Sequence, residues 1–346
     1  MIKSLETRRG FFYIFFRLIS NIVEKGGNMF VAKDSKGMIV NVLDKKCERG
    51  DYFCIVCQGK VLLRKGKKVR THFAHESLKN CLFSFENESP EHLNNKEELY
   101  KWLKKDSEVQ VEYPISAIKQ IADLFVNRKL ALEIQCSNLS QKTLQERSEG
   151  YRSNGNQVLW LLGKKLWLKK RLTRLQYDFL YFSQNMGFFA WELDQERKVL
   201  RLKYLLHQDL RGKLHYKIKE FPFGQGKLLD ILRFPFKQKD VASLIVAQDK
   251  DICRYIRKQL YYQNPLWMKR QAEAYQRGEN LLTYDLKDWY PQIQPIEGNN
   301  FCQINQSLIP YYKNFKAYYQ LMPKDDCHKL YPPAYYQQYF SKNMVK

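Results

Sequence analysis

The sequence predicts a mixed α/β (α+β) protein of several domains: a small β module with a metal-binding pattern, a core of element order αβββαβ, and a basic, aromatic-rich, mainly helical C-terminal domain. Its 346 residues, 44% of them hydrophobic, suffice for two or three domains with buried cores. Paired cysteines and histidines mark the first domain, and alternating helical and strand periodicities mark the second. The third is marked by charge, because residues 151–346 carry +16 of the net +23.

Residues 1–28 are predicted to be an upstream extension, non-native or disordered. The apolar run at 11–23 is too short to span a bilayer, contains Arg17 and lacks a signal-peptide cleavage site. Lys25-Gly26-Gly27 can be encoded by a purine-rich ribosome-binding sequence, so we expect Met29 to be the native start. The alternative is a frayed or membrane-associating N-terminal helix.

The first domain, residues 29–86, is predicted to consist of β-hairpins that hold a structural zinc ion. Four zinc-type ligands follow the spacing Cys-x2-Cys-x14-His-x2-His, namely Cys54, Cys57, His72 and His75. Gly59 lets backbone amides approach the sulfurs, and four protein ligands leave no open position for water. Cys81 or Cys47 could replace one histidine, and a metal-free hairpin with two buried thiols is the alternative.

The second domain, residues 87–163, begins with a helix. Ser89 is a suitable N-cap, Pro90 suits the first helical position, and apolar spacing extends the helix to about residue 105. His92 and Lys96 are four residues apart and therefore share one face. Strands are predicted at 109–115, 120–126, 130–135 and 158–162, with a second helix from about 140 to 154 between the last two.

Polar residues interrupt two of these predicted strands. Asp123 lies in the second strand, while Glu133 and Gln135 lie in the third and point to one face because they are two residues apart. An antiparallel hairpin would bring Asp123 beside Glu133. Two carboxylates are ligands that Mg2+ uses, and the metal can activate water against a phosphodiester. The alternative is solvent-facing carboxylates or a pair with Arg147.

Three motifs resemble the CoiA family of competence proteins from naturally transformable Gram-positive bacteria. They are Glu88-Ser89-x-x-His92-x-x-x-Lys96, Asp123-x9-Glu133-x-Gln135-x-Ser137 and Arg147-x-x-x-Tyr151. The cysteine pair and His-Phe-Ala-His also resemble the N-terminal module of that family. The resemblance covers residues 29 to about 162 and implies a restriction-endonuclease-like core of the PD-(D/E)xK type.

The resemblance also implies roles for single residues. Asp123 and Glu133 would bind Mg2+ or Mn2+, and Gln135 occupies the place of the catalytic lysine of the wider superfamily. This departure removes an ammonium that would neutralise charge in the transition state. Lys96 or His92 could supply a cation from the first helix. The carboxylate that relatives carry on that helix would be Glu88 or Glu91.

Beyond the core, residues 164–346 are predicted to form a basic domain that contacts nucleic acid. The expected contacts are Arg147 and Tyr151, followed by the basic stretch of Lys164, Lys165, Lys169, Lys170 and Arg171. An exposed linker is the alternative for this stretch, and a core role is the alternative for the aromatic residues. Helices are expected at 174–182, 240–262 and 265–276, with a hairpin of 188–193 and 199–202.

The function predicted from these features is cytoplasmic processing of single-stranded DNA, with RecA, during natural transformation, by a metal-dependent nuclease. The alternative is a non-catalytic single-strand-binding mediator that loads or stabilises RecA, which Gln135 favours. A third option is a purely structural interaction protein. No Walker motif or GxGxxG is present, so no nucleotide cofactor is expected. Because the apolar run at 11–23 is too short to span a bilayer, no membrane partner is expected either.

Overall fold

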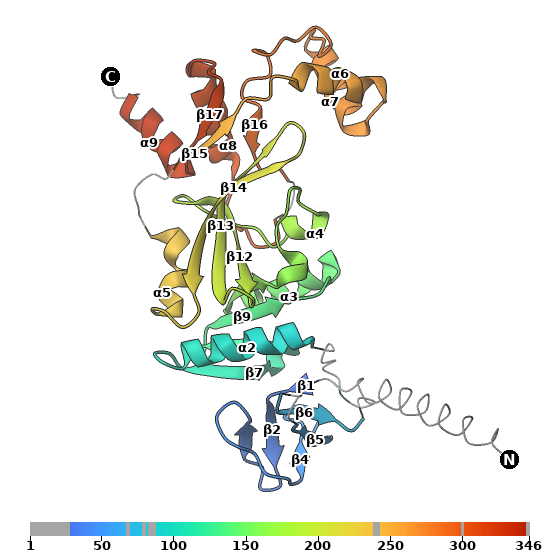
Figure 1. Ribbon diagram of the computed structural model, residues 1–346, viewed down its shortest axis with the longest axis vertical. Coiled ribbons are helices and arrows are strands. Elements are labelled where there is room, and N and C mark those ends of the chain that lie inside the picture. Colours follow the sequence, from blue (N-terminus) through green and yellow to red (C-terminus); the bar gives the residue numbers. More distant parts are fainter. Residues whose placement is uncertain are drawn as a thin grey trace, which may run out of the picture. The chain divides into compact units, whose positions relative to one another are not determined.

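The computed structural model describes residues 28–66, 70–77, 81, 88–237, 243–298 and 301–343 (Figure 1). The chain forms two compact units: the first consists of Met1–Cys136 with Glu149–Gly163, and the second of Ser137–Ser148 with Lys164–Lys346. Residues 1–27 of the predicted extension, including its apolar run, lie outside the described residues, whereas Asn28 at its end is ordered in a strand that pairs with Ala74. Within the described ranges, none of the helices combines the length and apolarity needed to cross a membrane.

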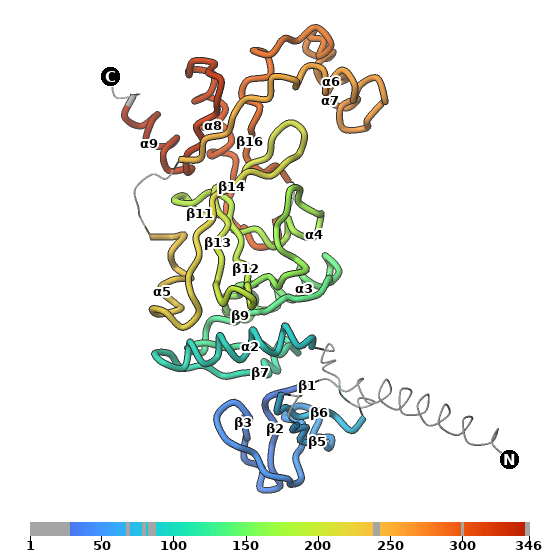
Figure 2. The backbone as a smooth tube through the Cα atoms, viewed as in Figure 1, coloured from blue at the N-terminus to red at the C-terminus, as the bar shows by residue number. Residues whose placement is uncertain are grey.

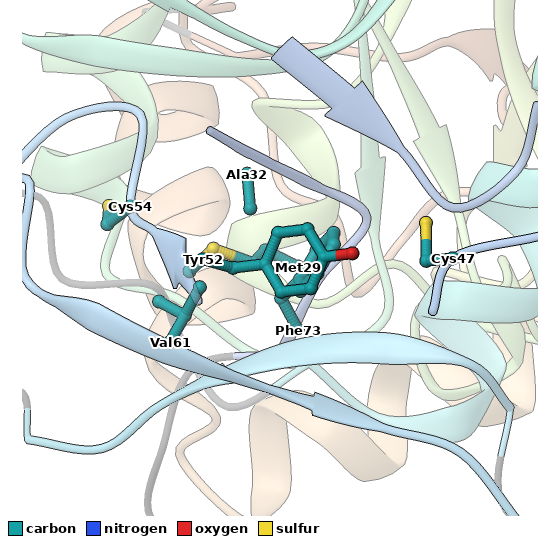
Figure 3. Close-up of a cluster of buried hydrophobic side chains, with 7 residues drawn as sticks. All are labelled: Met29, Ala32, Cys47, Tyr52, Cys54, Val61 and Phe73. Atoms are coloured by element: carbon teal, nitrogen blue, oxygen red, sulfur yellow. The ribbon is translucent and has the colours of Figure 1, made fainter. Parts of the chain in front are cut away.

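The first unit begins with a six-stranded sheet of order β1-β6-β5-β4-β2-β3. Its strands are β1 Asn28–Met29, β2 Val31–Asp34, β3 Ile39–Asn41, β4 Tyr52–Phe53, β5 Lys60–Arg64 and β6 His72–His75. All pairs are antiparallel, as the hairpins in the sequence indicated. One face buries a small core that includes Met29, Tyr52 and Phe73 (Figure 3).

The element order αβββαβ follows in the chain, as predicted. It consists of α2 Pro90–Leu103, β7 Val109–Ile115, β8 Gln120–Val126, β9 Leu130–Gln135, α3 Gln141–Ser153 and β10 Gln157–Leu162 (Figure 2). Ser89 caps α2, because its side chain accepts a hydrogen bond from the amide of His92 at 3.2 Å. The predicted inner face is correct, since Leu99, Trp102 and Leu103 are buried.

The register of these strands determines where the polar residues lie. β7 pairs with β8 and β8 with β9 in antiparallel fashion, whereas β9 and β10 are parallel. Pairing between β8 and β9 runs from Val126 opposite Leu130 to Leu124 opposite Leu132. Asp123 is the next residue of β8, so it lies where this ladder ends. Beyond this point β8 no longer pairs with β9, so backbone groups of β9 are available for contacts with side chains.

The second unit corrects the prediction of a mainly helical C-terminal domain. Long antiparallel strands occupy its first part: β11 Tyr181–Ser183, β12 Gly187–Asp194, β13 Val199–Asp209 and β14 Leu214–Pro222. The predicted hairpin is therefore correct but longer than expected. The helix predicted at 174–182 shortens to α4 Arg174–Tyr177. Arg201 and Lys203 lie buried within β13, where ion pairs replace the apolar contacts that periodicity detects.

Helices are more common later in the second unit. They are α5 Leu228–Leu232, α6 Ile252–Tyr261, α7 Pro265–Gln276, α8 Ile309–Leu321 and α9 Pro333–Asn343, with short strands β15 Leu244–Ala247, β16 Ile293–Pro295 and β17 Cys327–Leu330. The helix predicted at 265–276 is confirmed. The one predicted at 240–262 begins only at Ile252, because its earlier part contains β15, which pairs with β17.

Candidate metal sites and a basic surface

Three sulfurs and one imidazole converge in the N-terminal module. Cys54, Cys57, His75 and Cys81 each place one ligand atom within 4.8 Å of the others. The Cys57 sulfur lies 3.5 Å from Nε2 of His75. Cys3His is a donor set that holds structural zinc, and four protein ligands would close the site. Burial raises the pKa of the Cys54 thiol, so a bound cation would favour the thiolate that zinc requires.

The turn at the cysteine pair has the geometry expected of a zinc knuckle. The amide of Val56 donates to the Cys54 sulfur and the amide of Gly59 donates to the Cys57 sulfur, both at 3.4 Å. A Cβ on Gly59 would lie 3.2 Å from that sulfur, closer than most real contacts. Gln58 adopts a positive φ of 58°, which turns the chain back. The predicted approach of amides to sulfur is therefore present.

His72 is a correction to the predicted ligand set. Successive residues of a strand point to opposite faces, but His72 and His75 are three apart on β6 and cannot share one face in a regular strand. Nδ1 of His72 instead lies 2.7 Å from the carbonyl oxygen of Arg70. Cys81 takes the fourth place, which the sequence had left open as an alternative.

A second cluster forms where α2 passes over the end of the β8–β9 ladder. Glu88, His92 and Asp123 each place one ligand atom within 4.8 Å of the others. Nε2 of His92 lies 3.0 Å from Oδ1 of Asp123. The other oxygen, Oδ2, accepts a hydrogen bond of 2.8 Å from the amide of Ile134. This contact explains why an aspartate can interrupt a buried strand, because it satisfies a backbone donor that the ladder leaves unpaired.

Lys96 lies at the centre of this second cluster and is fully buried. Its ammonium is 2.5 Å from Oε1 of Glu88, 3.2 Å from Oε1 of Glu112 and 3.1 Å from Oδ1 of Asp123. Burial alone lowers the pKa of Lys96, but these carboxylates raise it well above the usual value. The i, i+4 spacing of His92 and Lys96 correctly predicted that the two side chains share one face of α2, where both contact Asp123.

The charges of the second cluster do not balance. Three carboxylates, those of Glu88, Glu112 and Asp123, face one ammonium, with the imidazole of His92 as a further cation when protonated. Burial alone raises the pKa of Asp123, but His92 and Lys96 hold it well below its usual range. Burial alone lowers the pKa of His92, but the carboxylate of Asp123 raises it, and the pKa is raised overall. Oε2 of Glu88 is buried without a hydrogen-bond partner among the described residues.

This donor set fits a hard divalent cation. Carboxylate oxygens and one imidazole suit Mg2+ or Mn2+, and the excess negative charge and the unpartnered Glu88 oxygen both favour a cation. Of the two candidate carboxylates, Glu88, which lies just before the N-cap of α2, belongs to this group of described residues, and Glu91 on the first turn of α2 does not. Glu112 was missed in the sequence, because its contacts are with residues remote in the chain.

Glu133 and Gln135 occupy a different environment from the one predicted. Both are buried on β9, and Glu133 is not a member of the group around Asp123. Its Oε1 accepts a hydrogen bond from the hydroxyl of Tyr151 on α3. Tyr151 itself is completely buried, which corrects its predicted role in contacting nucleic acid. Its spacing from Arg147 placed it on the helix face that packs against the sheet.

The predicted basic stretch is exposed in the second unit. Lys164, Lys165, Lys169, Lys170 and Arg171 are all exposed, while Leu166 and Leu168 between them are buried. Lys164 pairs with Glu196 at 2.5 Å. Lys169 and Lys170 border a hollow of about 550 Å³ that Lys213 and His215 also line. Arg147 lies on the part of α3 that belongs to the same unit.

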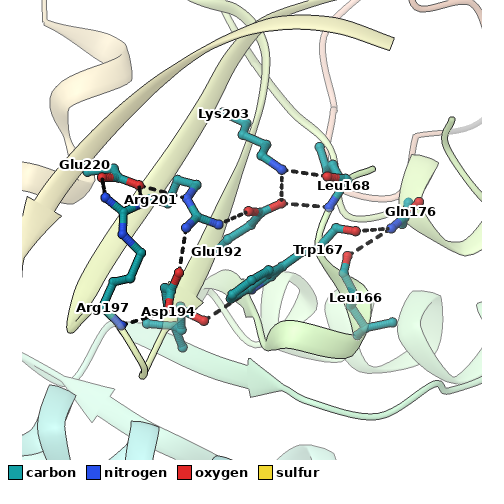
Figure 4. A network of polar contacts seen from close by, with 11 residues as sticks. Leu166, Trp167, Leu168, Gln176, Glu192, Asp194, Arg197, Arg201, Lys203 and Glu220 are labelled. Carbon is teal, nitrogen blue, oxygen red and sulfur yellow. Dashed lines mark hydrogen bonds and ion pairs between the residues drawn. The ribbon is translucent and has the colours of Figure 1, made fainter. Parts of the chain in front are cut away.

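Buried side chains fix the backbone of this basic stretch (Figure 4). Oε1 of Glu192 accepts from the amide of Leu168 at 2.7 Å, and the ammonium of Lys203 donates to the carbonyl of Leu168 at 2.6 Å. The amide group of Gln176 donates to the carbonyls of Leu166 and Trp167 at 2.9 and 3.0 Å. The stretch is therefore held in place by hydrogen bonds to the rest of the unit, unlike an unattached linker.

Comparison with known proteins finds two matching family models and one similar relative. The model of the competence protein CoiA N-terminal domain matches residues 39–84, and that of the CoiA nuclease-like domain matches residues 88–234. The competence protein CoiA of Bacillus subtilis (strain 168) is 35% identical over 173 residues, which cover 47% of this chain and 46% of the relative. The match thus spans less than half of that relative. No solved structure matches. With both of its domain models found in order along the sequence, the chain belongs to the CoiA family of competence proteins.

Proposed function

We propose that this protein processes internalised single-stranded DNA in the cytoplasm during natural transformation, together with RecA, through a metal-dependent core of the PD-(D/E)xK type. The observation that carries the proposal is the excess of buried carboxylates around Asp123, within a domain that matches a nuclease-like model. Membership in a family of competence proteins supports the process, and the order αβββαβ supports the type of core.

In this proposal Glu88, His92 and Asp123 hold Mg2+ or Mn2+, which supplies Lewis-acid polarisation of a phosphate and an activated water. The amide of Ile134 fixes the orientation of Asp123. Lys96 supplies the positive charge that the lysine position of the superfamily lacks here, since Gln135 stands there. Its buried ammonium would then counter charge that develops on the phosphate. Glu133 accepts a hydrogen bond from Tyr151 and lies outside the group that would hold the metal.

The N-terminal module is assigned a structural zinc ion in this proposal, held by Cys54, Cys57, His75 and Cys81. The basic stretch from Lys164 to Arg171 would contact the phosphates of the single strand. Its fixed backbone supports this role, because charges presented on an ordered segment lose less conformational entropy when they bind.

A second candidate is a non-catalytic mediator that binds single strands and loads or stabilises RecA. Two observations favour it: Gln135 provides no ammonium, and both oxygens of Asp123 already have protein partners. In this candidate the ion pair of Lys96 stabilises the core and no metal ion is needed there.

One experiment separates the two candidates. Labelled single-stranded, duplex and branched DNA are incubated with the protein in Mg2+ or Mn2+, beside Asp123→Ala and Glu133→Ala. The nuclease proposal expects cleavage by the wild type that Asp123→Ala abolishes while DNA binding persists. Binding and RecA loading without cleavage would support the mediator. Equal cleavage by all three proteins would place the chemistry elsewhere.

A further inference from the structure

Glu112 of β7 joins the N-terminal module to the carboxylate cluster of the core. Its Oε2 accepts hydrogen bonds from the amides of Phe30 at 2.7 Å and Val31 at 3.2 Å. Its Oε1 lies 3.2 Å from the ammonium of Lys96, which in turn lies 3.1 Å from Asp123. One carboxylate therefore contacts two amides of the module and the central cation of the cluster.

The module provides a second contact with the same lysine. The ring of Phe30 lies 6.0 Å from the ammonium of Lys96, and Phe30 is fully buried. A cation near an aromatic face is attracted to it, more strongly where water is excluded. The position of Phe30 thus affects Lys96 both through Glu112 and directly.

The segment that carries Phe30 and Val31 is held by the strands of the metal site. Met29 pairs with Phe73 on β6, the strand that ends at His75. Residues 33 and 34 of β2 pair with β4, which is followed at once by Cys54. Met29, Phe73 and Cys54 belong to one buried core (Figure 3). Disturbing this core would therefore displace the amides that Glu112 binds.

The backbone at Glu112 is consistent with a position under constraint. Its φ is +53°, a left-handed conformation that a residue with a Cβ adopts at some cost in energy. Strain of this kind persists where surrounding contacts compensate it, and the contacts of Glu112 are the two amides and Lys96. The turn in the backbone directs this side chain into the cluster.

We propose that Glu112 is a positioning residue, which holds Lys96 against Asp123 and makes that arrangement depend on the fold of the N-terminal module. Only the importance of Glu112 for catalysis rests on the proposed function, in which Asp123 and Lys96 belong to the catalytic site. The physical coupling itself concerns only the protein. It is tested without DNA.

The test uses the full chain and two perturbations. Glu112→Gln keeps an oxygen for the amides of Phe30 and Val31 but presents an amide group to Lys96. Phe73→Ala opens a cavity against Met29 and loosens the module from its own core. The measurements are the NMR signal of the Lys96 ammonium, which burial shields from solvent exchange, and hydrogen exchange at the amides of Phe30 and Val31. Glu108→Gln, an exposed change just before β7, is the matched control.

We expect Glu112→Gln and Phe73→Ala each to shift or broaden the Lys96 signal, and Glu108→Gln to leave it unchanged. Phe73→Ala should also raise exchange at Phe30 and Val31 by roughly tenfold or more. In the double variant, Phe73→Ala should change the Lys96 signal less than it does alone, because only the direct contact with Phe30 remains. An unchanged Lys96 signal in either single variant, or additive changes in the double variant, would overturn the proposal. A protein that passes this test yet never cleaves DNA would reject the nuclease and leave the coupling intact.

Discussion

The two units contain ionic clusters of different charge balance, each with a buried lysine or arginine at its centre. In the first unit, Lys96 is surrounded by three carboxyl groups. Burial raises the pKa of Glu112 to about 7, but Glu88 and Asp123 still outnumber the ammonium while His92 is neutral, so negative charge is in excess. In the second unit, three cations face three carboxylates in one network: Arg197, Arg201 and Lys203 with Glu192, Asp194 and Glu220. A balanced network needs nothing further, whereas an unbalanced one favours an added cation.

The contacts of the two clusters support the same distinction. The network of the second unit also binds backbone groups of Leu168, and Arg201 stacks 4.8 Å from the ring of Trp167 (Figure 4). Its polar groups serve to fix a neighbouring segment. The cluster of the first unit instead leaves Oε2 of Glu88 without a partner among the described residues. Burial of charge alone therefore does not favour a bound ion, but burial with an excess of negative charge does.

The largest effect expected from this difference concerns Asp123→Asn. The amide oxygen can still accept from Ile134, so the strands should remain in place, but the charge that binds a cation is lost. Metal-dependent cleavage should fall by about 10³-fold or more. The rate of cleavage of labelled single-stranded DNA measures it. Asp194→Asn, in the balanced network, is the control and should retain most activity in the folded protein. Similar losses in both variants would remove the distinction between the clusters.

Lys96→Met tests the charge imbalance of the first cluster by its effect on the free energy of unfolding. Removing the ammonium leaves three buried carboxylates without their main cation, which should destabilise the first unit by about 3 kcal/mol or more. Millimolar Mg2+ should recover part of this loss, because a divalent ion held by Glu88, His92 and Asp123 would restore positive charge beside the carboxylates. Denaturant unfolding with and without Mg2+ measures both effects.

Arg201→Met provides the matched comparison in the second unit. It should also destabilise the protein, since it leaves Glu192 and Asp194 without their shared partner. Mg2+ should give no recovery there. Equal recovery in the two variants would show that the ion acts nonspecifically on buried carboxylates.

Much of the first unit could be predicted from local sequence. Ser89 and Pro90 mark the start of α2, and regular alternation marks β7 to β9, because caps and periodicity depend on neighbouring residues. Asp123 was identified because a carboxylate within an apolar strand needs a partner. His92 and Lys96 were found by their spacing, but their joint contact with Asp123 depends on tertiary packing.

The remaining features depend on contacts between distant residues. Glu112 binds the amides of Phe30 and Val31, about eighty positions earlier, and nothing around Glu112 in the sequence marks it. Arg201 and Lys203 resemble surface residues until their partners on β12 are known. For the same reason β13 was underestimated in length, and the second unit was predicted to be more helical than it is.

Acidification should change the stability of the two units in opposite directions. Burial lowers the pKa of His207 in β13 to about 4, below the value near 6.5 of an unfolded chain. The unfolded state therefore takes up a proton first, and the second unit should lose roughly 3 kcal/mol as pH falls from 6.5 to 4. In the first unit, burial raises the pKa of Glu112 to about 7. Glu112 is therefore protonated first in the folded state, so its protonation should stabilise the first unit as pH falls over the same range.

Hydrogen exchange of amides from each unit between pH 7 and 4.5, corrected for intrinsic rates, measures these opposite trends. His207→Asn should weaken the trend of the second unit, and His328, whose pKa burial also lowers to about 4, should account for the remainder. Glu112→Gln should weaken the trend of the first unit. Identical trends in both units of the wild type would mean that global unfolding dominates and would contradict the separate assignments.

The smallest expected effect concerns the segment that the balanced network fixes. Lys169→Ala and Lys170→Ala should each weaken binding of single-stranded DNA only a fewfold, and reduce the slope of log affinity against log salt by about one. Lys142→Ala, an exposed lysine on α3 in the same unit, is the control and should leave the slope unchanged. Binding is measured by fluorescence anisotropy at several salt concentrations. If Lys142→Ala lowers the slope equally, the net charge of the unit determines binding, and the ordered backbone of the basic stretch gives it no special part.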